Sequence, residues 1–299
     1  MLQRVSPTDP LPHPTTVSTT TLASAQGPDA VAVCERKLAD ANLGRYFSVL
    51  FLPPPQRAAL AALYAFWEEV REIRDECTEA DVARIKLAWW HEELDEIFAG
   101  RPRHPVSVAL LPIIREFHLP AQTFFDILEA LAGPIVRPQF AAYAGLLDYG
   151  RRSRGTLEEL AAHVTTGTPA PSAIAAIGAR LELVALLQRA GADARRERCY
   201  LPEEDCARFG VAVAELSAVT PGAQALMQFE AERLERELRE NLTEAAERQA
   251  PLAIAARLAL AVLGRIRTQP KVALRDGVSI TPLRQLWIAW RTAHRSRRR

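Results

Sequence analysis

The sequence predicts an all-α protein with a single domain, and three observations support this. Ala and Leu dominate the 299 residues, whereas only 14 are Gly, a composition that favours helices. Apolar residues recur at spacings of three and four along most of the chain, which is the period of one helix face. No stretch shows sustained alternation of apolar and polar residues with β-branched enrichment, so no sheet is expected.

The helical pattern falls into segments that proline or glycine separates. We expect helices over residues 56–75, 82–98, 106–117, 121–131, 140–150, 172–190, 222–246, 254–267 and 282–292. The first follows three consecutive prolines and carries Leu60, Tyr64 and Trp67 at helical spacing. Gly100 ends the second. Segment 172–190 is a long Ala/Leu helix, and Gly191 inside the run after it predicts a break there.

Both ends of the chain differ from the helical part. Residues 1–29 hold five prolines among Ser and Thr and show no apolar period, so we expect a disordered tail that buries too little surface to offset its chain entropy. Residues 294–299 form a short basic tail, which leaves 30–293 as the helical domain. A solvated end is the simple interpretation of this basic tail, and a weak contact with anionic lipid is the alternative.

Charge and cysteine usage exclude several classes of protein. The formal net charge is only +1, so nothing attracts the chain as a whole to nucleic acid. The longest apolar run is too short to cross a membrane. The four cysteines are dispersed and form no CxxC pair, which suits reduced thiols in a cytoplasmic compartment and makes a zinc site unexpected. The basic tail leaves peripheral contact with an inner membrane as a further option.

Two helical segments carry dense charge. In 68–76 the acids at 68, 72 and 76 lie four apart, as do Arg71 and Asp75. In 188–196 Arg189 and Asp193 have the same spacing. Residues four apart share a helix face, so the simplest interpretation is a solvated face with ion pairs worth ~0.2–0.5 kcal/mol each.

Six short segments occur in a characteristic order along the chain. They are Tyr64-Ala65-Phe66-Trp67, residues 83–90, Gly100-Arg101-Pro102-Arg103-His104-Pro105-Val106, Leu146-Leu147-Asp148-Tyr149, Asp193-Ala194-Arg195-Arg196 with Tyr200-Leu201-Pro202, and residues 282–291. Together they resemble the squalene/phytoene synthase family over roughly residues 35–292. The resemblance implies an isoprenoid-synthase-like helical bundle around a central cavity.

That family joins two prenyl diphosphates head to head, and Mg²⁺ held by two facing aspartate motifs neutralises the diphosphate. By resemblance, Tyr64 and Tyr149 are catalytic tyrosines of the cavity. The substrate-binding residues that it implies are Arg71, Arg189, Arg198 and Tyr200. The motif acids that persist, as candidate metal ligands, are Glu72, Asp75 and Asp193.

The motifs depart from the family pattern at their leading acids. Arg71 and Arg189 each stand where the family has Asp, and Glu68 stands where it has a diphosphate-binding Arg. A guanidinium has no acceptor atom that could coordinate a metal ion. At a distance of ~4 Å it repels a divalent cation by about 8 kcal/mol at an effective dielectric constant of ~20. We therefore expect no cofactor, with Mg²⁺ and NADPH required only if the protein is an active synthase.

The paired exchange of Asp for Arg suggests a structural hypothesis. Arg71 would reach Asp193 across the cavity and Arg189 would reach Asp75, so that guanidinium groups replace the bridging metal ions. In the alternative, each Arg pairs only within its own helix. In a third arrangement, Arg71 and Arg189 hold a diphosphate directly, since guanidinium suits phosphate geometry.

Three functions remain open on the sequence alone. The first is a catalytically degenerate family member with a binding or assembly role, for which a mitochondrial respiratory complex I assembly factor of the same fold is a precedent. The second is an active transferase of farnesyl or geranylgeranyl diphosphate in squalene, hopanoid or carotenoid synthesis, with a remodelled metal site. The third is a metal-free prenyl-lipid binder. The partners expected are therefore a prenyl diphosphate or lipid, or another protein.

The tryptophans at 89, 90, 287 and 290 are expected in the core or the cavity wall.

Overall fold

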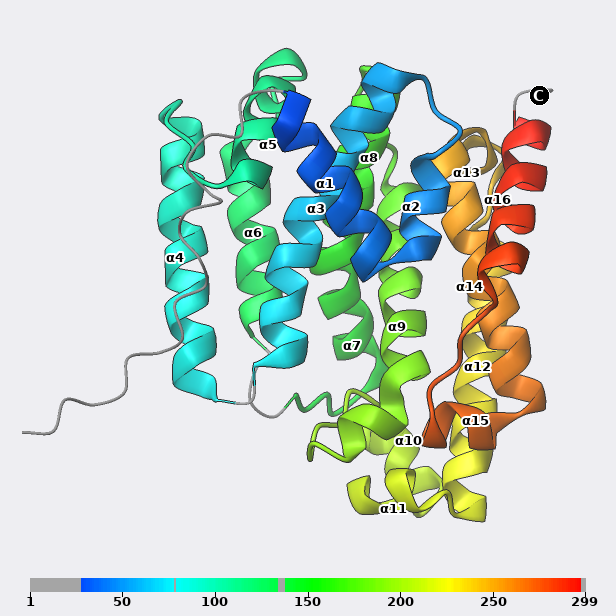
Figure 1. The fold of residues 1–299 in the computed structure, drawn as a ribbon. Helices are drawn as coiled ribbons and strands as arrows, with labels where there is room; N and C mark the ends of the chain where they lie inside the picture. Colours follow the sequence, from blue (N-terminus) through cyan, green and yellow to red (C-terminus); the bar gives the residue numbers. More distant parts are fainter. Residues whose placement is uncertain (1–27, 78, 134–137, 297–299) are drawn as a thin grey trace, which may run out of the picture.

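The computed structural model describes residues 28–77, 79–133 and 138–296, and these residues form helices and no strands (Figure 1). This confirms the predicted all-α class. The helices of the first half are α1 (Pro28–Ala41), α2 (Leu43–Val49), α3 (Pro54–Glu76), α4 (Ala80–Phe98), α5 (Pro105–Glu116), α6 (Ala121–Ala132), α7 (Tyr143–Gly150) and α8 (Thr156–Thr166). Those of the second half are α9 (Ser172–Ala194), α10 (Glu203–Arg208), α11 (Val213–Ala218), α12 (Pro221–Asn241), α13 (Glu244–Arg248), α14 (Ala250–Thr268), α15 (Pro270–Arg275) and α16 (Pro282–Ser296).

Each of the predicted helices is present, with ends that differ by a few residues. The predicted segment 222–246 is divided between α12 and α13, because Thr243 caps a new helix by accepting a hydrogen bond from the Ala246 amide. Helices α1, α2, α8, α10, α11 and α15 were not predicted. The expected tail 1–29 lies outside the described residues except for its last two positions, which begin α1. Helix α16 runs to Ser296, past the predicted end of the domain at 293, and 297–299 lie outside the described residues.

Buried side chains form two large apolar clusters. One gathers residues of α1, α3, α4, α5, α6 and α8, and the other gathers residues of α7, α9, α12, α14 and α15. Helix α8 of the first cluster packs against α9 of the second in the middle of the molecule (Figure 1), and side chains of α3 reach α9 through ion pairs. The site described below lies where these two halves meet.

Helix α9 does not break at Gly191, contrary to the prediction, and continues to Ala194. The glycine is required by packing, because a Cβ at this position would lie 1.8 Å from the carbonyl oxygen of Leu274 in α15. The absent side chain lets the α15 backbone rest directly on α9.

Replacing this glycine is expected to separate the two helices. Gly191→Ala should destabilise the fold by about 1–3 kcal/mol, because overpacking forces backbone to move. Gly264→Ala on α14 is the matched control, because nothing lies within 4 Å of its added Cβ. That variant should be neutral or more stable by up to ~1 kcal/mol, the helix propensity difference between Gly and Ala. Urea denaturation of both variants measures the difference, and equal stabilities would contradict it.

A short π-helical turn, Arg151–Gly155, joins α7 to α8 where they cross α9. The crossing is tight: a Cβ on Gly150 would lie 2.8 Å from the Ala179 carbonyl oxygen, and one on Gly178 would lie 2.8 Å from that of Arg154. Within this turn Arg152 has a side chain that is 61% exposed, whereas that of Arg154 is 11% exposed. The turn therefore directs Arg154 inward.

The tryptophans only partly follow their prediction. Trp90 is buried, at 3% exposure, but Trp89, Trp287 and Trp290 are 38%, 52% and 49% exposed. The prediction that they lie in the core or the cavity wall is wrong for these three, because helical spacing alone does not say which face of a helix is covered by its neighbours. Within the described residues, no helix combines the length and apolar character needed to cross a bilayer.

Candidate functional site

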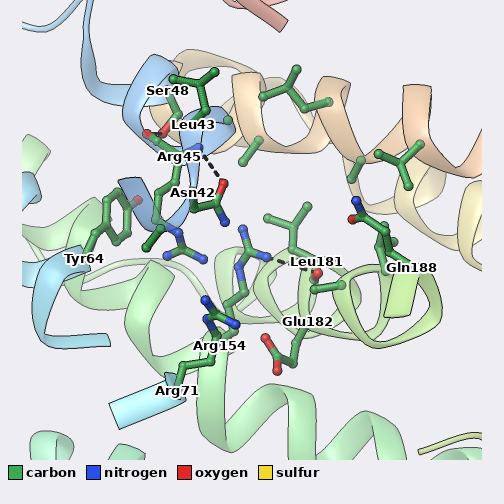
Figure 2. Close-up of a pocket in the computed structure, with 18 of the residues that line it drawn as sticks. Asn42, Leu43, Arg45, Ser48, Tyr64, Arg71, Arg154, Leu181, Glu182 and Gln188 are labelled. Atoms are coloured by element: carbon green, nitrogen blue, oxygen red, sulfur yellow. Dashed lines mark hydrogen bonds between the residues drawn. The ribbon is translucent and has the colours of Figure 1, made fainter. Parts of the chain in front are cut away.

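A cavity of about 400 Å³ lies between α2, α3, α8, α9 and α14 (Figure 2). Its wall is apolar on one side, through Leu181, Val184, Leu258, Val262 and Ile280. The other side is dominated by charge. The charged residues of the wall are Arg45, Arg71, Arg74, Arg154, Arg189, Glu158 and Glu182. The wall therefore carries more cations than anions, five against two.

Helix α3 supplies the centre of the charged wall. Tyr64, Trp67, Arg71 and Arg74 follow one another at spacings of three and four, so they share a face. This face begins apolar and buried and ends in arginines. The periodicity that buries the first half of α3 therefore places its second half against the cavity.

Asp75 is the anion on which these arginines converge. Its Oδ1 lies 2.8 Å from Nε of Arg74, and its Oδ2 pairs with both Arg71 and Arg189. The side chain is 6% exposed. Burial would raise the pKa of this carboxyl, but the three guanidinium groups hold it well below its usual range. Asp75 is therefore a carboxylate whose charge is already neutralised within the protein.

The pairing of Asp75 tests the two cross-cavity contacts. Arg189 of α9 reaches Asp75 of α3 as predicted. The other proposed pair does not form: Arg71 pairs instead with Glu68 at 2.6 Å and with Asp75, both on its own helix. Arg189 also pairs within its own helix, at 3.2 Å from Asp193. One arginine therefore bridges the two motifs and the other stays within its motif.

Arg74, only 2% exposed, connects α3 to three further elements. Its Nη1 donates to Glu182 of α9 at 2.6 Å and to the hydroxyl of Tyr149 of α7. Its guanidinium carbon lies 5.8 Å from the ring centre of Tyr200. Arg74 thus fixes the positions of two tyrosines that the sequence marked.

Arg45 and Arg154 enter the cavity from opposite sides (Figure 2). Arg45 is 6% exposed and lies over the ring of Tyr64, 4.7 Å from its centre. Its Nε lies 3.3 Å from Glu68, but its buried Nη1 has no hydrogen-bond partner among the described residues. Arg154 donates to the Leu181 carbonyl at 3.1 Å and to Glu158 at 3.3 Å. Burial lowers the pKa of Arg154, and the positive charge of Arg45 lowers it further. The two cations repel each other across the cavity.

The tyrosines of the site are protonated phenols. Tyr64 donates to Glu158 at 3.0 Å, and burial raises its pKa well above the usual value. Burial also raises the pKa of Tyr149, and it raises that of Tyr200 to about 12. Of these three, Tyr64 lines the cavity, whereas the other two are buried beside it next to Arg74.

Arg198 lies outside the cavity lining, although the resemblance marked it as substrate-binding. It is buried at the end of α3, where it donates to the carbonyl of Arg74 at 2.7 Å and to that of Cys77. The last carbonyls of a helix lack partners within the helix and attract cations. Arg198 therefore caps α3, and Arg196 assists by donating to the Asp75 carbonyl at 2.8 Å.

The remaining candidate acids also lie away from the cavity wall. Glu72 pairs with Lys37 of α1 at 2.5 Å, and that lysine also contacts Glu69 at 3.1 Å. Asp193 is 2% exposed, and its Oδ2 has no hydrogen-bond partner in the part of the chain that the structure describes. Burial raises the pKa of Asp193, and the negative charge of Asp75 adds to the increase.

Sequence reasoning missed several residues of the site. Arg74 was available from the period of α3, since it lies seven residues after Trp67 on the same face. Arg154 was hidden by the π-helical turn, which no pattern predicted. Arg45 lies in the short helix α2, whose seven residues show no clear period.

Comparison with known proteins identifies the relationship. The family model of squalene/phytoene synthase matches residues 39–284 of this chain. The chain belongs to the squalene/phytoene synthase family. Among solved structures, a dehydrosqualene synthase determined with a ligand superimposes with a TM-score of 0.74, covering 91% of this chain and 98% of that one at 22% identity. A squalene synthase from Alicyclobacillus acidocaldarius gives a TM-score of 0.68 at 23% identity, covering 81% and 94%.

Several curated relatives within the squalene/phytoene synthase family are phytoene synthases. The 15-cis-phytoene synthase of Synechococcus elongatus is 28% identical over 63% of this chain and 66% of its own length. That of Synechocystis is 29% identical over 69% and 66%, and phytoene synthase 3 of Zea mays is 26% identical over 57% and 42%. The chain thus spans just under two thirds of the cyanobacterial enzymes and under half of the maize enzyme. The structural neighbours confirm the isoprenoid-synthase-like fold.

Proposed function

We propose that this squalene/phytoene synthase family member binds a prenyl diphosphate through arginines, without Mg²⁺, and does not join two of them head to head. The observation that carries the proposal is the position of the charges. Arg71, Arg74 and Arg189 line the cavity, whereas Asp75, which they neutralise, does not. The cavity therefore offers cations where the family resemblance implies metal-binding carboxylates.

The acids present do not fit a Mg²⁺ centre. Mg²⁺ takes carboxylate and phosphate oxygens in octahedral geometry. Here Asp75 is occupied by three guanidinium groups and Glu72 by Lys37. Within the part of the chain that the structure describes, no group of three or more His, Cys, Asp or Glu side chains is placed to hold a metal.

The cationic wall suits a diphosphate better than it suits a neutral ligand. Guanidinium groups pair with phosphate oxygens in a bidentate manner. Arg45 offers a buried Nη1 that no atom of the described residues satisfies, and leaving a buried donor unsatisfied is costly. An anion between Arg45 and Arg154 would satisfy that donor and relieve their repulsion. The apolar wall near Leu258 and Ile280 supplies contacts for a prenyl chain.

An activity assay tests the catalytic half of the proposal. The purified protein is incubated with farnesyl or geranylgeranyl diphosphate, Mg²⁺ and NADPH, and hydrocarbons and diphosphate products are extracted and identified. We expect no squalene, phytoene or cyclopropyl diphosphate product. Formation of any of these would establish instead the second candidate, an active transferase with a remodelled metal site.

A binding titration tests the other half. We expect calorimetry to detect farnesyl diphosphate binding in the presence of a chelator, because the arginines need no metal. Arg45→Met should weaken binding about tenfold or more, the loss expected for one charge-assisted hydrogen bond of about 1.5–3 kcal/mol. Arg152→Met is the matched control, since Arg152 lies two residues from the cavity-lining Arg154 but points to solvent. No binding at millimolar ligand, or equal losses in both variants, would reject the site.

A further inference from the structure

Helix α16 presents an apolar strip to solvent. Leu283, Leu286, Trp287 and Trp290 are 81%, 36%, 52% and 49% exposed. Within the described residues, these are four of the eight large apolar side chains that are exposed. The adjoining side of the helix is covered, because Ala289 and Ala293 are buried where α16 packs near α14 and α2. Among the residues that the structure describes, folding therefore leaves the aromatic side of this helix without a partner.

The charge on α16 is of one sign. The helix carries Arg284, Arg291 and Arg295 and contains no Asp or Glu, and the sequence continues with three more arginines at 297–299. The guanidinium carbon of Arg291 lies 5.1 Å from the ring centre of Trp287. Cationic and aromatic groups are thus interleaved along one exposed face.

We propose that α16 docks the protein on an anionic lipid surface, lying in the plane of the interface. Helices that bind in this way combine tryptophan and leucine on one face with basic residues beside it. Tryptophan prefers the headgroup level of a bilayer, and each basic residue near an anionic surface adds to the attraction. Charge complementarity selects this occupant: a symmetric contact between two copies of α16 would place like charges together.

A groove beside α16 offers a place for a lipid headgroup. It has a volume of about 490 Å³ and is lined by Arg291 and Arg295 of α16, by Arg257 of α14 and by Glu247 of α13, which pairs with Arg257 at 2.7 Å. With Arg257 paired to Glu247, Arg291 and Arg295 are the guanidinium groups that fit the phosphate of a headgroup. Docking there would also bring the bilayer close to the central cavity, since Gln285 of α16 lines that cavity and the next residue, Leu286, is exposed.

Co-sedimentation with vesicles tests the docking surface. The full chain is mixed with vesicles of phosphatidylcholine alone or with phosphatidylglycerol added, and the bound fraction is measured at low and high salt. We expect binding to the anionic vesicles and loss of it in high salt. Leu283→Gln with Trp287→Gln and Trp290→Gln should weaken binding by about tenfold or more, because the apolar strip no longer inserts. Arg284→Gln with Arg291→Gln and Arg295→Gln should do the same for anionic vesicles.

The matched control lies on α4, which carries Val82, Ile85 and Trp89 at 41%, 70% and 38% exposure. Changing these three to Gln removes a similar exposed apolar surface, and we expect less than about a twofold change in vesicle binding. Circular dichroism melting confirms that each variant is folded. Equal losses from the α4 and α16 variants, or no binding of the parent protein to either vesicle, would overturn the proposal. So would a dimer in light scattering that the α16 variant converts to a monomer, because the strip would then bind a second copy. The proposal requires nothing of the central cavity, so its outcome is independent of the proposed function.

Discussion

Asp75→Asn is expected to destabilise the protein by about 3–5 kcal/mol, the usual cost of removing one partner from a buried ion pair. Three guanidinium groups converge on this carboxylate. Without its charge, Arg71, Arg74 and Arg189 would repel one another in a site that is largely closed to water. Urea denaturation at neutral pH, with the midpoint and slope compared with the parent protein, gives the difference.

Asp81→Asn provides the control for this prediction. Asp81 also pairs with an arginine on its own helix, Arg84, but their side chains are 82% and 71% exposed. Exposed pairs contribute about 0–1 kcal/mol, so this variant should be close to the parent protein. Similar losses for Asp75 and Asp81 would show that the convergence of arginines on Asp75 carries no special stability.

The effect of Asp75→Asn should depend on pH with a defined sign. The folded-state pKa of Asp75 is depressed by its three arginines. Its contribution is therefore complete above the unfolded pKa, about 3.9, and is lost as the pH falls further. We expect the gap in stability between Asp75→Asn and the parent protein to be constant from pH 6 to 8 and to narrow below about pH 4.

Restoring both family acids, by Arg71→Asp with Arg189→Asp, should reverse the ligand preference of the cavity. Two cations that line the wall become anions, so metal-free binding of farnesyl diphosphate should weaken by well over about tenfold, since each lost charge-assisted hydrogen bond costs about 1.5–3 kcal/mol. The new acids lie near Asp75, Glu68 and Asp193. The negative charge concentrated there should favour the binding of a cation. Calorimetry with farnesyl diphosphate, in chelator and in Mg²⁺, measures both changes.

Thermal unfolding gives a second result for this double variant. Mg²⁺ should raise its melting temperature, because an ion that binds only the folded state stabilises it, and should leave that of the parent protein unchanged. Synthase products that form only in the double variant would identify the arginine pair as the cause of inactivity. If Mg²⁺ stabilises the parent protein and the variant equally, the argument from occupied carboxylates is wrong.

The sequence was sufficient for the fold and for half of the site. Helical periodicity located the long helices, because each buries a regular apolar face. The contact between Arg189 and Asp75 could also be predicted, because both facing motifs carry Arg where the family has its leading Asp. These predictions depend on residues that follow the helical period or the spacing of the family motifs.

The rest of the site depends on tertiary geometry that no local pattern records. Arg198 caps α3 because the chain after α9 happens to pass the exposed carbonyls there. Arg154 points inward because a π-helical turn rotates it relative to Arg152. Gly191 looked like a helix break, and its role became visible only with the α15 carbonyl placed against it.

The pair between Arg189 and Asp75 also changes what holds α3 and α9 together. A metal ion that bridges two acidic motifs binds reversibly from solution. The occupancy of its site therefore follows the ion concentration, and a chelator removes the ion. A guanidinium on the same chain has a fixed effective concentration and does not dissociate from the protein. The two helices thus carry their counter-ion permanently, and the distance between them should not vary with the supply of divalent ions.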